Sequence, residues 1–437
     1  MHVIADLQLH SRFSRAVSPQ MTLPNIAAWA ARKGIDLVAT GDWMHPIWFR
    51  EIESQLEEQG NGLLTLKSEA QSTKSETFFL LATEVSSIYS QGGKVRRVHT
   101  LVWVPTIESA RKISQEMTKR GCNLMSDGRP IVGLSCIHIA ELVLSIEPRA
   151  LIIAAHAWTP WFSVYGEKGG FESLDEAFGP YAKYIYAIET GLSSNPAMNW
   201  RIKELDARSI VSFSDAHSGP KLGREATVFT IPEISYEHIY EAIRTQTNIA
   251  YTIEFYPEEG KYHWSGHRAC GIRWGPEDTK VKGTTCPVCG KPLVQGVVQR
   301  VEALADRSEK DLWLVKTKSG MIMSKAFPNR PPFAMLVPLQ EIISEAIGSP
   351  VASPKVQGPY SAVTDALGGE FAVLLEASTD AIAKIAGERV AQGVDKVRRG
   401  DLVIDPGYDG VFGVVKLWRE GEEKPLLDSS KEQLSLL

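Results

Sequence analysis

Histidine and acidic side chains lie at or next to the ends of successive apolar segments in the first 250 residues. The segment 3–9 is followed by His10, and the segment 151–155 by His156. The other side chains of this kind at such positions are Asp42, His45, Glu84, His99, Glu189, Asp215 and His217. Imidazole and carboxylate groups together suit divalent ions such as Zn²⁺, Mn²⁺ and Fe²⁺. Without a cation, carboxylates gathered in one place would raise one another's pKa and lose their charge.

A second set of metal-ligand residues is local in the sequence. His267-x-x-Cys270 and Cys286-x-x-Cys289 have the spacing that holds a tetrahedral zinc ion. Four nitrogen and sulfur ligands leave no open coordination position, so we expect this zinc to be structural. His263 is an alternative to His267 as the histidine ligand. A pair of free thiols beside a stray histidine is the alternative without zinc.

The elements that must bring the first set together are strands separated by helices. Strands are predicted at 3–9, 36–40, 78–83, 98–104, 151–155, 184–188 and 209–214, and helices at 22–33, 107–120 and 199–206. Near-continuous apolar strands alternating with helices predict a parallel sheet covered on both faces. The number of strands favours a closed β/α barrel, and an open doubly wound sheet is the alternative. Loops after barrel strands gather at one face, which would unite the ligands.

Length and composition restrict the class of protein. The chain has 437 residues, of which 43% are hydrophobic and 23% charged, so two or three globular domains are expected and disorder is excluded. The net charge of −5 means that a polyanion must be held by a local basic groove. No apolar segment is long enough to span a membrane. An odd number of cysteines and an N-terminus that starts directly with a strand predict a cytoplasmic protein without a disulfide framework.

The alternation of apolar strands and helices ends at about residue 255. We expect an α/β fold with a barrel, a small zinc-binding module and a mixed, mainly helical C-terminal region. The predicted parts are a barrel at 1–255, a zinc knuckle at 256–300, a mixed α/β segment at 301–347, a linker rich in proline and glycine at 348–360, a helical and hairpin region at 361–418 and a flexible tail at 419–437.

Over residues 1–254 the ligand pattern resembles the PHP (polymerase and histidinol phosphatase) family of metal-dependent phosphoesterases. The resemblance implies a (β/α)7 barrel and two or three divalent ions (Zn, Mn, Mg or Fe). It also implies that Glu84, Asp215 and His217 are catalytic. The ligands that it implies are His10, Asp42, His45, Glu84, His99, His156, Asp215 and His217.

The sequence departs from the PHP family in its first motif. That motif is usually His-x-His, and Gln8 stands in the earlier place. Glutamine is a poor ligand, so one metal position would be weaker, completed by water or empty. Asp6 would either replace the missing ligand or hold another ligand in place. Bound metal ions would activate a water molecule for attack on phosphorus and neutralise the phosphate oxygens.

Longer motifs indicate a more specific family. The segments Gly-Asp-Trp-Met-His-Pro at 41–46 and His-Ala-Trp-Thr-Pro-Trp-Phe at 156–162, together with the Gly-His-Arg-x-Cys and Cys-Pro-x-Cys-Gly pair, resemble the endonuclease Q family over about three quarters of the chain. This resemblance implies a DNA repair endonuclease. The enzyme would cleave the phosphodiester 5′ to deaminated bases (hypoxanthine, uracil, xanthine) or to abasic sites.

Aromatic and basic side chains next to these motifs are candidates for contacts with DNA. Trp158, Trp161 and Phe162 could stack on an extruded base, and packing in the core is the alternative. The basic side chains flank the metal motifs, where they would bind phosphates or remain solvated. These candidates are Arg12, Arg15, Lys221, Arg224 and Arg268.

The last five residues, Gln-Leu-Ser-Leu-Leu, resemble the short peptide by which bacterial repair proteins bind the sliding clamp. The predicted anchors are Gln433, Leu434, Leu436 and Leu437, and a frayed helix end is the alternative. Two other functions remain open at this point. One is a PHP phosphatase acting on a small phosphomonoester, for which a zinc module is unnecessary. The other is a non-catalytic DNA-binding or clamp-binding module that lost a metal with Gln8.

Overall fold

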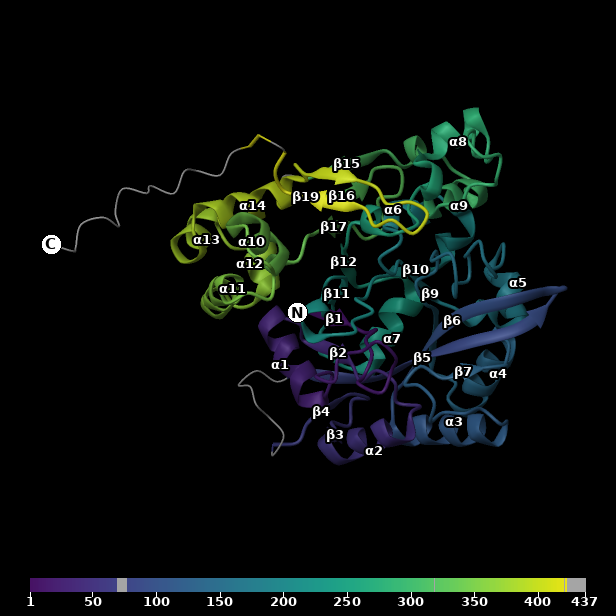
Figure 1. Ribbon diagram of the computed structural model, residues 1–437. Coiled ribbons are helices and arrows are strands. Elements are labelled where there is room, and N and C mark those ends of the chain that lie inside the picture. The colour runs from purple at the N-terminus through teal and green to yellow at the C-terminus, as the bar shows by residue number, and fades with distance from the viewer. Residues whose placement is uncertain (69–76, 318, 420, 423–437) are drawn as a thin grey trace.

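The computed structural model describes residues 1–68, 77–317, 319–419 and 421–422. At its centre is a large mixed sheet (Figure 1). In spatial order its strands are β10 (Ser209–Val211), β9 (Ala187–Glu189), β8 (Leu151–Ala154), β6 (Lys94–Val104), β5 (Phe78–Gln91), β2 (Leu37–Ala39), β1 (His2–Asp6), β11 (Ala226–Thr230), β12 (Ile249–Glu254), β17 (Phe333–Met335), β16 (Met321–Ser324) and β15 (Leu314–Lys316). Three short strands lie off this path: β3 (Leu56–Glu58), β4 (Leu64–Leu66) and β7 (Ile131–Val132).

The prediction of a parallel sheet is only partly correct. The pairs β1–β2, β2–β5, β8–β9 and β9–β10 are parallel, whereas β5 pairs antiparallel with β6, and β6 with β8. The strands β5 and β6 are far longer than predicted and form a hairpin closed at Gly92 and Gly93. Both glycines have positive φ (60° and 73°), which a tight hairpin turn requires. The two-glycine turn therefore makes these two strands antiparallel, where a parallel sheet was expected.

The path of strands curves back on itself. An isolated parallel bridge joins Leu9, after β1, to Ala216, after β10. The His10 amide donates to the Ala216 carbonyl oxygen at 3.0 Å. The ends of β1 and β10, which lie far apart in the sheet order, are therefore neighbours, and so are the ligand candidates that follow them.

Helices cover this sheet, and their ends agree with local sequence signals. They are α1 (Leu23–Lys33), α2 (Pro46–Gln55), α3 (Ile107–Lys119), α4 (Cys136–Ile146), α5 (Leu174–Phe178), α6 (Pro196–Trp200) and α7 (Tyr236–Thr245). The prediction of a helix at 22–33 is confirmed: α1 carries a proline in its first turn and ends at Gly34 in the left-handed conformation. The helix predicted at 199–206 is instead the end of α6 followed by a separate 3₁₀ turn, Lys203–Ala207.

After β12 the chain forms a small region above the sheet and then returns to it. That region holds β13 (Ser265–His267), β14 (Ile272–Trp274), α8 (Pro276–Lys282) and α9 (Val297–Leu304). The chain then adds β15, β16 and β17 to the edge of the central sheet, where β17 pairs parallel with β12. The segment after residue 304 is therefore continuous with the sheet that carries the ligand candidates.

The C-terminal part is a group of helices beside α1 followed by a hairpin (Figure 1). Its elements are α10 (Leu339–Ile347), α11 (Pro354–Leu367), α12 (Glu370–Leu375), α13 (Thr379–Ala386), α14 (Glu388–Arg399), β18 (Val403–Asp405) and β19 (Val414–Lys416). The predicted linker at 348–360 is wrong in its second half, because α11 begins at Pro354 and contains Pro359. Burial of Val356, Tyr360 and Val363 outweighs the cost of an internal proline.

Within the described part of the chain, no helix combines the length and apolar character that crossing a bilayer requires. The predicted clamp-binding residues Gln433, Leu434, Leu436 and Leu437 lie outside the described residues.

Candidate metal centres and the adjoining cavity

Glu84 is the centre of the first group of ligand candidates. It lies in β5, while His99 comes from β6 and His156 follows β8. His156 Nε2 lies 3.0 Å from Glu84 Oε1, and His99 Nδ1 contacts the same oxygen. The second carboxylate oxygen, Oε2, lies 3.0 Å from His10 Nε2. All four side chains are buried, so one carboxylate joins three imidazoles inside the protein.

A second group is formed by His10, Asp215 and His217, whose ligand atoms lie within 4.8 Å of one another, as do those of Glu84, His99 and His156. His10 Nε2 lies 3.2 Å from Asp215 Oδ1, yet both atoms are buried without a hydrogen-bond partner. Two buried lone-pair atoms that face each other without a hydrogen bond are costly. A divalent cation between them would satisfy both, so these residues fit a metal site.

The protonation states of the first group also suit a metal. Burial by itself would raise the pKa of Glu84, but the charge of Arg129 and hydrogen bonds from neighbouring imidazoles hold it well below its usual range. Burial lowers the pKa of His99 to about 4, so its ring is neutral and keeps a free lone pair. A charged carboxylate and a neutral imidazole are the forms that bind divalent ions.

Asp42 contacts His10 at Nδ1, the ring nitrogen that does not face Glu84. His10 Nδ1 lies 2.9 Å from Asp42 Oδ1, and Asp42 Oδ2 accepts hydrogen bonds from the Ser11 amide at 2.6 Å and from the hydroxyls of Ser11 and Ser14 at 2.7 and 2.9 Å. A carboxylate on the far nitrogen of a ligating histidine fixes the ring and its tautomer. The structure thus gives Asp42 a contact to a ligand, and its own role as a ligand stays a prediction.

His45 lies next to these groups but belongs to none of the candidate clusters in the described residues. It caps the N-terminus of α2, where its Nδ1 accepts from the Trp48 amide at 3.4 Å. Its ring stacks on Phe13 with 4.5 Å between centroids. Its predicted ligand role therefore also stays a prediction.

Gln8, which stands where PHP proteins have a histidine, is buried against Glu189. In the amide orientation that satisfies its hydrogen bonds, the Gln8 nitrogen donates to both Glu189 oxygens. Glu189 Oε2 also accepts from the His156 amide at 2.7 Å, and burial raises the pKa of Glu189 well above its usual range. Asp6 accepts from the Ser214 amide and hydroxyl at 3.0 and 2.6 Å, next to Asp215. Glu189 therefore holds the backbone of His156, and Asp6 holds that of Ser214, the residue before Asp215.

Arg129 is a further residue at the site that no sequence motif indicated. Its Nη1 lies 3.3 Å from Glu84 Oε2, and its side chain is 25% exposed, so part of the guanidinium faces solvent beside the first group. The Asp127 carboxylate accepts from the Arg129 amide at 3.2 Å and orients this loop. No motif or strand end precedes Arg129, so only its Asp-Gly-Arg-Pro turn composition marked the position.

Several non-glycine residues at the site have a strained, left-handed backbone conformation. Non-glycine residues with positive φ include Asp42 (47°), His156 (28°), Phe162 (62°), Leu192 (62°) and Asp215 (47°). Such conformations cost about 1–3 kcal/mol each and persist where the surrounding structure over-determines them. The ligand-bearing turns are therefore held in place by packing.

A cavity of about 360 Å³ adjoins the metal-ligand groups. On one side it is lined by His99, His156 and Asp215, and on the other by residues 260–263 and Val297. Aromatic side chains complete its walls: the rings of Trp161 and Tyr262 meet edge to face at 5.0 Å. A mainly apolar pocket of this size with a few polar groups is typical of a ligand site.

The predicted aromatic residues divide between this cavity and the core. Trp161, which is 37% exposed, and Phe162 line the cavity. Trp158 is 1% exposed, stacks on Tyr165 at 4.8 Å and donates from Nε1 to Asn199 Oδ1 at 2.7 Å. Trp158 therefore has the packing role that was the alternative for these residues.

The predicted basic residues differ in how they relate to the site. Arg224 donates from Nε to the Ser214 carbonyl oxygen at 2.7 Å and from Nη2 to that of Asp215 at 3.2 Å, so it supports the ligand loop. The other basic candidates lie at the surface. Arg12 pairs with Glu51 (2.6 Å), Arg15 with Asp127 (3.4 Å) and Lys221 with Glu341 (2.8 Å), while Arg268 is exposed.

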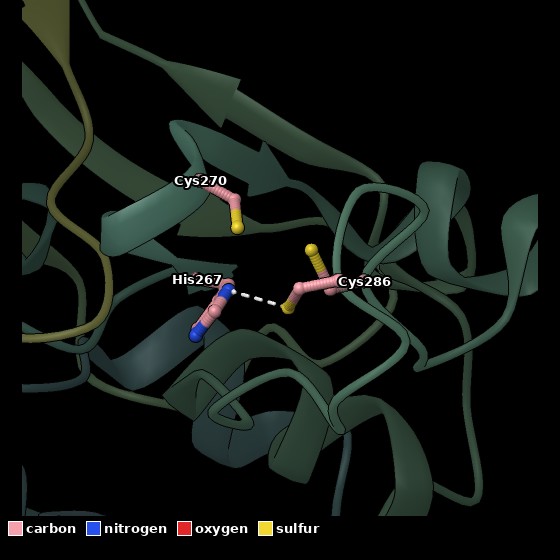
Figure 2. Close-up of side chains that lie close together, drawn as sticks. His267, Cys270 and Cys286 are labelled. Carbon is pink, nitrogen blue, oxygen red and sulfur yellow. Dashed lines mark hydrogen bonds between the residues drawn. The ribbon is translucent and has the colours of Figure 1, made fainter.

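The cysteine motifs meet as predicted. Figure 2 shows His267, Cys270 and Cys286 with their side chains turned toward one another. The ligand atoms of these residues and of Cys289 lie within 4.8 Å of one another, and Cys289 Sγ lies 3.4 Å from His267 Nδ1. His263 lies outside this group and lines the cavity, so the geometry favours His267 of the two histidines.

The turn between Cys286 and Gly290 shapes one half of this group. The Gly290 amide donates to the Cys286 carbonyl oxygen at 2.9 Å, and Gly290 has a φ of 71°, which favours glycine. Burial would raise the pKa of the Cys286 thiol, but the backbone amides of Cys289 and Val288 lower it to about 6. A thiol that ionises readily is suited to binding zinc.

Comparison with known proteins identifies relatives over the whole chain and over parts of it. A family model described as the MJ0043 C-terminal domain matches residues 338–401. The uncharacterized protein YqxK of Bacillus subtilis is 28% identical over 436 residues, which covers 95% of this chain and 99% of that protein. The uncharacterized protein MJ0043 of Methanocaldococcus jannaschii is 33% identical over 268 residues, 60% of this chain, and the match spans 31% of that longer relative.

Two solved structures match almost the complete chain. One is the lesion-specific endonuclease PfuEndoQ from Pyrococcus furiosus, with a TM-score of 0.80, 31% identity and 95% of both chains covered. The other is an endonuclease Q complex with a 27-mer duplex substrate that has an abasic lesion at the active site, with a TM-score of 0.79, 32% identity, and 96% of this chain and 98% of that chain covered. At this identity and coverage, the chain belongs to the endonuclease Q family.

Proposed function

We propose that this chain is a DNA repair endonuclease that hydrolyses the phosphodiester 5′ to a deaminated base (hypoxanthine, uracil or xanthine) or an abasic site. One observation carries the proposal: His99, His156 and Asp215 belong both to the metal-ligand groups and to the wall of a cavity of about 360 Å³. Hydrolytic groups and a pocket for an extruded nucleotide are thus adjacent. The family relative solved with an abasic duplex supports DNA as the substrate.

The proposed metal centre lies in a PHP-type barrel formed by residues 1–255. Glu84, His99 and His156 would hold one divalent ion, and His10, Asp215 and His217 would hold another. A third position would involve Asp42 and His45. Bound divalent ions supply an activated water molecule and neutralise phosphate oxygens. The ions are Zn, Mn, Mg or Fe, and two or three are bound.

The chain's own groups orient this chemistry. Asp42 keeps the His10 ring in one tautomer with Nε2 toward Glu84 and Asp215. The exposed part of Arg129 binds the scissile phosphate, because its guanidinium lies 3.3 Å from Glu84 and its side chain is partly open to solvent. Arg224 holds the Asp215 carbonyl oxygen and so keeps that carboxylate in place.

The cavity receives the extruded base. Trp161, Phe162 and Tyr262 offer aromatic surface, and stacking contributes about 1–3 kcal/mol per base. Extrusion costs least where a base is damaged, mispaired or missing, which favours lesions over normal DNA. Two polar groups in the wall, Ser193 Oγ and His263 Nδ1, have no hydrogen-bond partner among the described residues and are available to hydrogen-bond the edge of a deaminated base.

We assign a structural zinc ion to His267, Cys270, Cys286 and Cys289 in a knuckle formed by residues 256–300. This ion would stabilise the region that supplies the second wall of the cavity, including Tyr262 and His263. Zinc binding and the shape of the base pocket are thereby linked.

The test is a nicking assay on oligonucleotides that each carry one lesion, with Mg²⁺, Mn²⁺ and Zn²⁺ compared, next to an aryl phosphate as a generic monoester. We expect a single nick 5′ to the lesion and no comparable turnover of the aryl phosphate. Turnover of the aryl phosphate alone would instead identify a PHP phosphatase. Binding of lesion DNA without any nicking would identify a non-catalytic module.

The C-terminal residues Gln433, Leu434, Leu436 and Leu437 are proposed to bind the bacterial sliding clamp. Deleting residues 433–437 should leave nicking of naked DNA unchanged and abolish capture of the chain by the clamp. Equal capture of the full chain and of the deletion variant would contradict this role.

A further inference from the structure

The hairpin of β18 and β19 carries exposed apolar side chains at its tip, and nothing in the proposed function uses them. Phe412 is 66% exposed, and Val411 and Val414 beside it are 39% and 42% exposed. An exposed phenylalanine of this kind on a turn contributes little to folding, because its ring stays in water. Its position relative to the cavity is therefore the informative feature.

The tip is fixed to the segment that forms one wall of the cavity. The amide groups of Gly407, Gly410 and Gly413 donate to the carbonyl oxygens of Glu258, Lys261 and Glu259 at 2.8, 2.9 and 3.0 Å, respectively. A Cβ on Gly413 would lie 2.0 Å from the Glu258 carbonyl oxygen, so the two segments touch through their backbones. Phe412 is thus displayed from a rigid base.

Lys261 connects the tip to the cavity. It lines the cavity, and its Nζ lies 4.4 Å from the centre of the Phe412 ring. Phe412 therefore stands at the rim of the pocket, with a cation beside it that is available for a phosphate. On the same rim, Trp161 is 37% exposed.

We propose that Phe412 is the wedge that enters the DNA duplex at the position vacated by the extruded nucleotide. This inference rests on the proposed function. Proteins that distort DNA insert apolar side chains between base steps, and the inserted ring replaces the stacking that the departing base loses. A rigid, exposed phenylalanine next to a base-sized pocket satisfies both requirements. The Lys261 ammonium group would hold the phosphate that flanks the insertion.

The wedge is tested by comparing substrates that differ only in the cost of extrusion. Single-turnover nicking would be measured on one sequence containing uracil, as a full duplex and as a single strand, with wild type, Phe412→Ala and Phe412→Leu. We expect Phe412→Ala to slow nicking of the duplex by about tenfold or more, and to change the single-strand rate by less than about twofold. Phe412→Leu should recover part of the duplex rate, because leucine can also insert.

Trp313→Ala is the matched control, since Trp313 is 69% exposed and does not line the cavity. It should leave both rates unchanged. A Phe412→Ala variant that nicks both substrates at the wild-type rates, or that loses both equally, would overturn the wedge. A wild-type protein that nicks neither substrate would instead contradict the proposed function.

A binding measurement makes the test independent of single-strand activity. 2-Aminopurine placed next to the lesion reports unstacking by increased fluorescence. In a Glu84→Ala background, binding should raise this fluorescence, and the rise should be lost with Phe412→Ala. The same rise with and without Phe412 would refute insertion. Unchanged zinc content and thermal unfolding would show that the variant is folded.

Discussion

The two groups of candidate metal ligands differ in how they are built. The cysteine and histidine ligands all come from residues 267–289, and Cys289 is exposed. The imidazole and carboxylate ligands come from residues between His10 and His217. Glu84 and His99 lie within the long strands β5 and β6, and the other ligands follow strands. In this group His10 is 1% and Glu84 2% exposed. A local group can form with little help from the rest of the chain, whereas the buried group requires the complete sheet.

Ligand chemistry explains this difference. Four nitrogen and sulfur ligands close the coordination of zinc, and their binding free energy stabilises a small region that has few buried apolar residues. Carboxylates and imidazoles, in contrast, leave positions for water and phosphate, so they serve catalysis and depend on a rigid fold for their geometry. Removing a ligand should therefore affect activity in one group and stability in the other.

The largest expected effect is that of Glu84→Ala. Glu84 contacts His10, His99 and His156, so its loss should lower nicking by more than about 100-fold. Mutation of a residue that only orients a metal ligand typically lowers activity by about 10- to 100-fold, and Glu84 is itself a proposed ligand. Nicking rates and metal content would be measured together, with Glu53→Ala on the surface of α2 as control. Normal nicking by Glu84→Ala would remove the assigned role.

Chelation should separate the two groups without mutation. Thiolate ligands hold zinc more tightly than oxygen and nitrogen ligands hold Mn²⁺ or Mg²⁺. Graded treatment with EDTA should therefore abolish nicking while one zinc ion per chain remains, and added Mn²⁺ or Mg²⁺ should restore nicking. Metal content by mass spectrometry and activity would be followed in parallel. If zinc leaves before activity falls, the two assignments are reversed.

Cys286→Ser should act mainly on stability. The affinity of the local group for zinc should fall by at least about 10- to 100-fold, and the thermal unfolding temperature should decrease. Binding of lesion DNA should weaken because the second wall of the cavity loosens, which would be measured by KM rather than kcat. Cys122→Ser, which alters a free thiol outside the group, is the control and should keep its zinc. Unchanged zinc content in Cys286→Ser would refute the ligand set.

The smallest effect is expected for Gln8→His, which restores the histidine of the PHP motif. Gln8 now donates to Glu189 and offers no good ligand atom, so the imidazole should raise the affinity of the buried group for a divalent ion by up to about tenfold. Metal titration followed by calorimetry would measure this change, with the exposed Gln20→His as control. A lower affinity would mean that the contact between Gln8 and Glu189 is needed to hold the site.

The local group was predictable because short spacings determine it. Two pairs of ligands, each three residues apart and separated by a short segment, can meet in almost any fold. The helix α1 was predictable for a similar reason, since a proline in its first turn and Gly34 at its end mark its limits. The choice between His263 and His267 was not settled by spacing, because both are within reach of the cysteines.

The amino-acid sequence alone identified the side chains that follow β1, β8 and β10 and the residues of the cysteine motifs, because these depend on local hydrophobic and turn patterns. It wrongly placed Glu84 and His99 at strand ends, because both lie within the strands of the β5–β6 hairpin. The three-dimensional structure was needed to establish that the Gly92–Gly93 turn makes β5 and β6 antiparallel, that α11 includes Pro359, and that Arg129 reaches Glu84. It also showed that residues 260–263 and Val297 close a cavity over His99 and His156. These features depend on packing between segments tens to hundreds of residues apart, which no local pattern records.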